Sequence, residues 1–332
     1  MTEYHSILKE EIKEFFELQV SNKAQYTRMH YRSTLEELDS YLRQTKAQTK
    51  ELTKQQLDDW IRSLKGKPST IQGKACKVRK LCRFLRDIGI QAADPDLPIV
   101  RQDYVAYHFT DAELERLYDW IDNLEIHYRK LESNETLFIA FPVIFRILLC
   151  CGTRIGETLS LKVGDIDFSS GCIHLLRNTK GKKQRIVPMH QDLTVILKLY
   201  CERIAIIHNP DSVLFPRYFG SETPIKQKTI TYVFHTLLLR LGIASPAITS
   251  DDSIHERGPC IHCLRHAFAF RAFRQCESHG MAVNDMVPYL SYYLGHERLN
   301  ETEKYLKFSP ELQPETTDTF DSYSSSVFPE VL

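Results

Sequence analysis

Seven side chains suited to phosphate chemistry follow one another along the chain between residues 154 and 305. An arginine and a glutamate lie in CGTRIGE, directly after a long apolar segment, and a lysine lies in the turn of the basic stretch NTKGKKQRIVPM. HCLRH supplies a histidine and an arginine, LGHE supplies a second histidine, and a tyrosine follows nine residues later in TEKYLKF. Guanidinium groups match phosphate oxygens, and a phenol can act as a nucleophile. The set predicts a phosphate site made of Arg154, Glu157, Lys180, His262, Arg265, His296 and Tyr305.

In order and spacing, these residues resemble the signature of the tyrosine recombinases, also called the phage-integrase family. That signature is an arginine, a hairpin lysine, His-x-x-Arg, and a histidine nine residues before a tyrosine. The resemblance covers residues 110 to 307. It implies that Tyr305 attacks the scissile DNA phosphate and leaves a 3′-phosphotyrosine link and a free 5′-hydroxyl. Because a free phenol has a pKa of about 10, the attack needs a base, and His262 is the best candidate.

The resemblance implies roles for the other side chains as well. Arg154 and Arg265 would hold the non-bridging oxygens, where one preorganised donor is worth roughly 10²–10³ in rate. His296 would add a further hydrogen bond to the same phosphate. Lys180, directly before a glycine in the turn, would protonate the departing 5′-oxygen. Glu157 would orient either the base or Arg154.

This chemistry requires neither a metal nor a nucleotide, so we expect no cofactor. The covalent bond to the tyrosine conserves the phosphodiester energy, and a 5′-hydroxyl can reverse the attack. The competing interpretation is a zinc site at the Cys-x-x-Cys of CIHC. We do not favour it, because a structural zinc site normally has a second regularly spaced ligand pair, and zinc would remove the base from catalysis. The ligands would come from Cys260, Cys263, His255, His262, His266, Cys276 and His279.

The elements that must position these residues are mostly helices. Four helices are expected between residues 5 and 90, the third capped by Thr53 and Gln56 and the fourth starting near residue 69. A proline-containing linker follows, and Thr110 with Glu113 caps the first helix of a second domain. Short strands are expected between residues 165 and 189. We predict a mainly α protein with a small antiparallel β-sheet: a DNA core-binding domain at 1–94, a linker at 95–109, a catalytic domain at 110–307 and an acidic tail at 308–332.

The net charge of zero hides a segregated distribution. There are 43 basic and 43 acidic residues, yet residues 62 to 86 hold nine bases and no acid, and the tail from residue 309 holds five acids and no base. Clustered bases of this kind predict contacts to DNA phosphates. The resemblance implies two domains that close around duplex DNA. The predicted contacts are Arg62, Lys65, Lys67, Lys74, Lys77, Arg79, Lys80, Arg83 and Arg86, with Lys182, Lys183 and Arg185 on the hairpin.

The function expected is therefore site-specific DNA recombination for a mobile element. A type IB topoisomerase-like relaxing enzyme and a DNA-binding accessory protein that does not cut are the alternatives. The partners expected are double-stranded recombination sites and further copies of the chain, which would form a tetramer in the synaptic complex. Three points stay open: whether the free protein is a monomer, whether a second recombinase takes part, and whether a directionality factor is needed. The tail would dock on a neighbouring copy or compete with DNA. There are nine cysteines, an odd number, and no signal peptide is expected, which predicts reduced thiols in the cytoplasm. The longest apolar run contains Pro142 and Arg146, so no membrane span is expected. We therefore predict a bacterial cytoplasmic protein that is associated with the nucleoid when it is bound to DNA.

Overall fold

The chain divides into two compact units, Met1–Asp103 and Tyr104–Leu332, in a computed structural model. The structure describes residues 3–100, 107–123, 135–177, 179, 184–244 and 258–307, except for the side chains of 135, 283 and 304–307. The boundary between the units falls inside the predicted linker. The roles assigned to the segments stay predictions.

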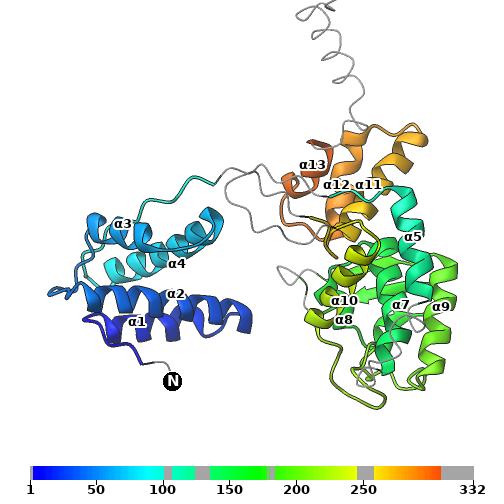
Figure 1. The fold of residues 1–332 in the computed structure, drawn as a ribbon, viewed down its shortest axis with the longest axis horizontal. Helices are drawn as coiled ribbons and strands as arrows, with labels where there is room; N and C mark the ends of the chain where they lie inside the picture. Colours follow the sequence, from blue (N-terminus) through cyan, green and yellow to red (C-terminus); the bar gives the residue numbers. More distant parts are fainter. Residues whose placement is uncertain are drawn as a thin grey trace, which may run out of the picture. The chain divides into compact units, whose positions relative to one another are not determined.

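The first unit is built from helices. They are α1 (Lys9–Phe15), which continues into the π-helical turn η1 (Phe16–Val20), α2 (Gln25–Gln44), α3 (Lys54–Ser63) and α4 (Pro68–Asp87), drawn in blue to cyan in Figure 1. The predicted capping box starts α3, because Thr53 Oγ1 accepts the Gln56 N–H and Gln56 Oε1 accepts the Thr53 N–H. Trp60 is completely buried in the core between these helices. The expectation of four helices over this region is confirmed, with the π-helical turn as an extension of the first.

The second unit places a three-stranded sheet among helices. The sheet has the order β1 (Ile166–Asp167), β2 (Cys172–Leu175), β3 (Arg185–Pro188), with both pairings antiparallel. The apolar helix α7 (Glu135–Cys151) lies in the core, as its lack of a polar face predicts. The predicted mainly helical fold with a small antiparallel sheet is confirmed. The other elements are α5 (Asp111–Asp122), α8 (Ile155–Leu159), η2 (Val163–Asp165), α9 (Gln191–Arg203), α10 (Gln227–Arg240), α11 (Cys263–Ser278), α12 (Val283–Leu294) and α13 (Asn300–Lys307).

Two helix starts in this unit follow from local sequence. The predicted box at Thr110 and Glu113 caps α5. Arg154 itself caps α8, because the Glu157 carboxylate accepts its backbone N–H. In the described part of the chain, no helix is both long and apolar enough to cross a membrane.

Candidate active site

The turn between α7 and α8 places Arg154 at the edge of the site. Gly152 makes this turn with φ of +59°, and a Cβ there would lie 2.4 Å from the Phe268 ring, so the position requires glycine. Arg154 Nη1 donates to Glu157 Oε1 at 2.9 Å, and its side chain keeps 20% of its surface exposed. The predicted role of Glu157 in orienting Arg154 agrees with this contact.

Glu157 is a buried carboxylate with two arginine partners. Its side chain has no exposed surface, and Arg185 donates to both of its oxygens, at 3.0 and 2.8 Å. Burial by itself would raise the pKa of Glu157, but the hydrogen bonds and charges of Arg185 and Arg154 outweigh it and hold the pKa below its ordinary value. Glu157 is therefore ionised at neutral pH and can hold two guanidinium groups.

Three arginines meet at the C-terminal end of α12. Its last carbonyls have no partners within the helix, and three consecutive ones accept from side chains distant in sequence. Arg185 Nε donates to Tyr293 O at 2.8 Å, Arg265 Nη2 to Leu294 O at 2.6 Å, and Arg154 Nη2 to Gly295 O at 3.1 Å. The negative end of the helix dipole favours this concentration of positive charge.

His296 follows a glycine turn at the same helix end. Gly295 has φ of +64°, its N–H donates to Tyr292 O, and the His296 N–H donates to Ser291 O. This pair of bonds is the Schellman arrangement that ends many helices. It fixes the backbone of His296 directly beside the carbonyls that hold Arg265 and Arg154.

His262 precedes the first residue of α11. Although part of its ring is exposed, the protein packed around it, followed by the charges of Arg265 and Arg154, lowers its pKa to about 4. The ring contacts that of His266 edge to face, with centroids 4.8 Å apart. Burial, followed by the neighbouring histidines and Arg265, lowers the pKa of His266 to about 3. A neutral imidazole at His262 is the form that a general base needs.

Arg265 is buried behind this surface. Only 1% of its surface is exposed, and its two Nη atoms donate to Gly152 O at 2.7 Å and Leu294 O at 2.6 Å. It therefore joins the turn before Arg154 to the end of α12. Its predicted contact with a phosphate oxygen stays a prediction.

The structure thus brings together five of the seven predicted site residues: Arg154, Glu157, His262, Arg265 and His296. Tyr305 lies within α13, but its side chain is outside the described residues. Lys180, Lys182 and Lys183 also lie outside them. Their predicted roles are untested.

The assignment of Arg185 to DNA contact is wrong. Its side chain is only 4% exposed, and Nε, Nη1 and Nη2 each donate to Tyr293 O or Glu157, so the protein holds this guanidinium and does not present it to DNA. The neighbouring lysines suggested a continuous basic hairpin. In a strand, however, side chains alternate between faces, and this one points inward. Thr302, whose hydroxyl contacts His296, was also missed, and no local pattern marks it.

The basic run of the first unit is only partly free of acids. Arg62 pairs with Asp59 at 2.7 Å, and Lys74 pairs with Glu37 at 2.6 Å. The expectation of uncompensated charge is corrected for these residues, since Asp59 on the same helix reaches Arg62 and Glu37 of α2 reaches Lys74. Lys77 donates to a carbonyl of its own helix.

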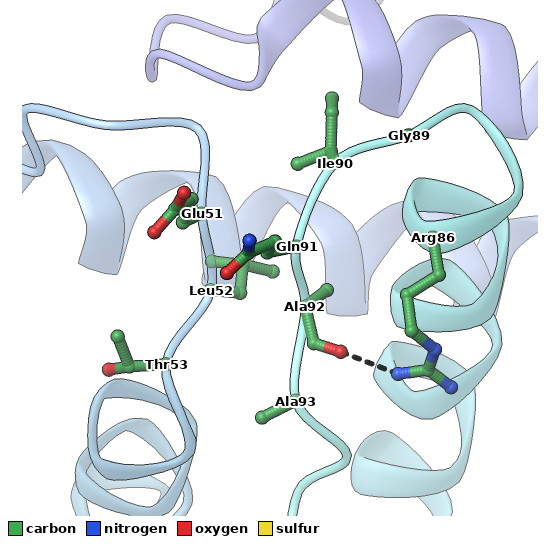
Figure 2. Close-up of a pocket in the computed structure, with 9 residues that line it drawn as sticks. All are labelled: Glu51, Leu52, Thr53, Arg86, Gly89, Ile90, Gln91, Ala92 and Ala93. Carbon is green, nitrogen blue, oxygen red and sulfur yellow. Dashed lines mark hydrogen bonds between the residues drawn. The ribbon is translucent and has the colours of Figure 1, made fainter.

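Arg86 and Arg79 bind the segment after α4. Arg86 donates to Ala92 O at 2.6 Å, and Arg79 donates to Pro95 O at 2.8 Å. Figure 2 shows Arg86 beside a pocket of about 520 Å³, with its guanidinium turned to the Ala92 carbonyl. Both guanidinium groups also approach Asp94. We therefore assign them to holding this segment and not to DNA.

Six members of the run are exposed. Arg62 and Arg86 are held by the contacts described above, and the others are Lys65, Lys67, Lys80 and Arg83. Lys80 and Arg83 line a pocket of about 330 Å³ together with Lys23, which comes from the turn before α2. Lys23 lies far from the run in sequence and was not predicted. Only the folded structure, which brings the turn before α2 next to α4, reveals it.

The cysteine cluster was the competing metal site. Cys260 and Cys263 have their sulfurs 3.6 Å apart, and both are free thiols. Across the described residues, no three His, Cys, Asp or Glu side chains are close enough together to hold a metal ion. His255, one of the candidate ligands, lies outside those residues.

Comparison with known proteins identifies the family. The model of the phage integrase family matches residues 107–311, which is more than half of the chain, so the chain belongs to the phage integrase family. A putative integrase/recombinase of Sinorhizobium fredii, y4rB, is 27% identical over 212 residues, 63% of each chain. A tyrosine recombinase of Pseudothermotoga lettingae is 22% identical over 297 residues, which are 87% of this chain and 90% of that protein.

Solved structures share the fold. The Tn1549 transposon integrase, in complex with a circular intermediate DNA, has a TM-score of 0.58 and 17% identity, over 89% of this chain and 93% of that one. The recombinase XerH, bound to a palindromic difH substrate, has a TM-score of 0.64 and 18% identity, over 90% and 81%. The matched part spans 63% of the length of y4rB and 47% of that of XerH from Campylobacter jejuni.

Proposed function

We propose that this protein is a site-specific DNA recombinase that integrates, excises or transposes a mobile element. The observation that supports it best is the convergence of Arg154, Arg265 and His296 on one end of α12, with His262 near both arginines. Five residues separate this helix end from α13, which contains Tyr305. A member of this family with these side chains in contact has the groups that phosphoryl transfer to a tyrosine requires. No cofactor takes part.

The reaction transfers one phosphate between oxygens. Tyr305 Oη attacks the phosphorus as neutral His262 takes the phenolic proton, and the bond to the 5′-oxygen breaks. Lys180 gives that oxygen a proton, so a 5′-hydroxyl leaves and a 3′-phosphotyrosine remains. Arg154, Arg265 and His296 stabilise the charge that builds on the non-bridging oxygens. A 5′-hydroxyl from another strand then reverses the steps.

We assign the segments accordingly. Residues 1–94 contact duplex DNA through Lys80, Arg83 and their exposed neighbours, 95–109 link the units, and 110–307 carry the reaction. Residues 308–332 dock on a neighbouring copy in a synaptic tetramer. The partner is a pair of double-stranded recombination sites.

A suicide substrate tests the activity. A duplex nicked near the candidate cleavage position loses its short fragment, so the covalent adduct accumulates. The wild-type chain should form a protein–DNA adduct, and Tyr305→Phe should form none while still binding DNA. An adduct that persists in Tyr305→Phe would disprove the nucleophile.

Plasmid relaxation, together with adduct formation, separates the alternatives. A topoisomerase-like enzyme would relax supercoiled plasmids that have no recombination site, whereas a recombinase should require a specific site. A DNA-binding accessory protein would bind the site and form no adduct.

A modified leaving group tests the general acid. A 5′-thiol leaving group needs little protonation, so it should restore cleavage by Lys180→Ala. Restoration of Lys182→Ala instead would move the role to Lys182.

A further inference from the structure

Arg185 occupies a place that neither the signature nor a DNA contact explains. It is the first residue of β3, and its side chain is 4% exposed. Its Nη atoms hold the buried carboxylate of Glu157, and its Nε holds Tyr293 O at the end of α12. A single side chain therefore joins the sheet, α8 and α12.

We propose that Arg185 is a positioning residue for Arg154, acting through Glu157. This role rests on the proposed recombinase activity. Arg185 does not touch the phosphate. It sets the charge and the orientation of the Glu157 carboxylate, which in turn holds the half-buried guanidinium of Arg154.

The sharing of Glu157 supports this role. Glu157 Oε1 accepts from both Arg154 Nη1 at 2.9 Å and Arg185 Nη1 at 3.0 Å, while Oε2 accepts from the Arg154 backbone and Arg185 Nη2. Four donors thus fix the plane of the carboxylate. Because bidentate pairing sets direction as well as strength, loss of Arg185 would free the carboxylate to rotate.

The charge balance leads to the same conclusion. With Arg185 present, one buried negative charge lies between two positive ones, and Arg154 keeps net positive charge for an anion. Without Arg185, Glu157 and Arg154 would form a neutral pair in a site with little water. Arg154 would then be drawn toward the carboxylate and attract a phosphate less.

The packing at Gly295 extends the effect to His296. A Cβ at Gly295 would lie 3.1 Å from Arg185 Nη1, so the two are in close contact. Arg185 therefore supports the turn that places His296. Its loss should disturb the contacts that Arg154 and His296 are predicted to make to the non-bridging oxygens, while the nucleophile and its base stay in place.

Arg185→Lys is the informative variant, since it keeps the charge and removes the planar fork. Its matched control is Arg177→Lys. Arg177 lies in the segment after β2 and pairs with the buried carboxylate of Asp165. Both variants lose one arginine–carboxylate pair, but Asp165 does not contact Arg154. Single-turnover cleavage is measured on suicide duplexes that carry a phosphodiester or a methylphosphonate at the scissile position. DNA affinity and the thermal midpoint are measured for every variant.

The ratio of the two cleavage rates reports on charge stabilisation. A methylphosphonate has a methyl group in place of one charged oxygen, so it depends less on Arg154. Arg185→Lys should cleave the phosphodiester about tenfold more slowly than the wild type, lose less rate on the methylphosphonate, and bind DNA unchanged. Arg177→Lys should keep the wild-type ratio. Equal losses on both substrates, or the same change in Arg177→Lys, would overturn the role.

A second variant covers the case in which Arg185→Lys does not fold. Glu157→Gln keeps the shape of the side chain and loses the carboxylate that orients both Arg154 and Arg185. Because Arg154 then loses its fixed position, the ratio should shift in the same direction despite the loss of the negative charge. An unchanged ratio in Glu157→Gln would overturn the proposal. If the wild type formed no adduct with either substrate, the proposed recombinase activity would fail, and the role of Arg185 with it.

Discussion

His296 Nδ1 and Thr302 Oγ1 lie 2.6 Å apart and are joined by a hydrogen bond. His296 is 8% exposed and Thr302 is completely buried. Thr302 lies on α13, three residues before Tyr305, so one bond links a predicted phosphate ligand to the helix of the predicted nucleophile. The position of the imidazole and the delivery of the tyrosine are thereby coupled.

Replacement of Thr302 by valine should reduce strand cleavage. The variant keeps the volume of the side chain and removes the hydroxyl, which leaves the buried imidazole nitrogen without this partner at a cost of about 1–3 kcal/mol in unfolding free energy. We expect cleavage to fall about tenfold with DNA affinity unchanged. Single-turnover adduct formation measures the rate. Thr302→Ser, which keeps the hydroxyl, serves as the control and should retain most activity, and an equal loss in both variants would contradict the coupling.

Stability should fall in acid because of His266, whose ring is half-buried. His266 has a folded-state pKa of about 3 against an ordinary value of 6.5, so below pH 6.5 the unfolded chain binds a proton that the native protein does not. Its contribution is fully present above pH 6.5 and is lost as the pH falls toward 3. The slope from one fully linked proton is about 1.4 kcal/mol per pH unit. Urea unfolding of wild type and His266→Asn at pH 7.5 and 5 should show a smaller loss in the variant, and an identical loss would contradict this.

Gly152→Ala should be the more damaging of two glycine substitutions near the site. A Cβ at Gly152 would lie 2.4 Å from the Phe268 ring in a left-handed turn, whereas one at Gly295 would first meet the Arg185 side chain at 3.1 Å. Left-handed backbone alone costs an alanine about 1–2 kcal/mol, and the ring contact adds overpacking of about 1–3 kcal/mol. Denaturant midpoints compare the variants. Gly220→Ala, with positive φ and open space around its Cβ, is the control for backbone strain alone.

DNA binding should depend on the exposed bases of α4 and not on the paired ones. Lys80→Ala with Arg83→Ala should weaken binding similarly for specific and unrelated duplexes and lower the salt slope by about 2, one for each phosphate contact. Binding titrations at several salt concentrations give this slope. Arg86→Ala should leave the slope unchanged and lower the thermal midpoint, since Arg86 holds Ala92 O. A lower slope for Arg86→Ala would restore it as a DNA contact.

Chelation should leave cleavage unchanged. Cys260→Ser with Cys263→Ser should cleave at close to the wild-type rate, because the predicted chemistry uses no metal. Adduct formation before and after treatment with a strong chelator tests this. Loss of activity that zinc restores would revive the cysteine site and remove His262 from its role as base.

Removal of residues 309–332 would test the tail. It takes away five acids and no base, so the net charge rises from 0 to +5. We expect tighter binding to unrelated DNA, measured by titration, together with weaker synapsis, measured by the assembly of paired sites. Unchanged binding would show that the tail does not compete with DNA.

The amino-acid sequence determined the class of protein and the chemistry expected of it. The order Arg, Lys, His-x-x-Arg, His and Tyr can be recognised in the sequence without knowledge of the fold. The same holds for the capping boxes at Thr53 and Thr110. The capping boxes depend on residues three apart, whose relative positions the start of a helix fixes. The apolar run of α7 likewise predicted a buried helix.

The tertiary structure decided which cations face a phosphate and which face the protein. In the sequence, Arg185 and Arg86 belong to basic clusters that suggest DNA contacts. In the structure, Arg185 binds Glu157, which lies 28 residues away. Arg86 binds the carbonyl of Ala92, in the segment that follows its helix. The meeting of Arg154, Arg185 and Arg265 at three consecutive carbonyls joins residues up to 141 positions apart. Such pairings depend on where the folded chain places buried charges and unpaired helix ends, which spacing along the sequence does not encode.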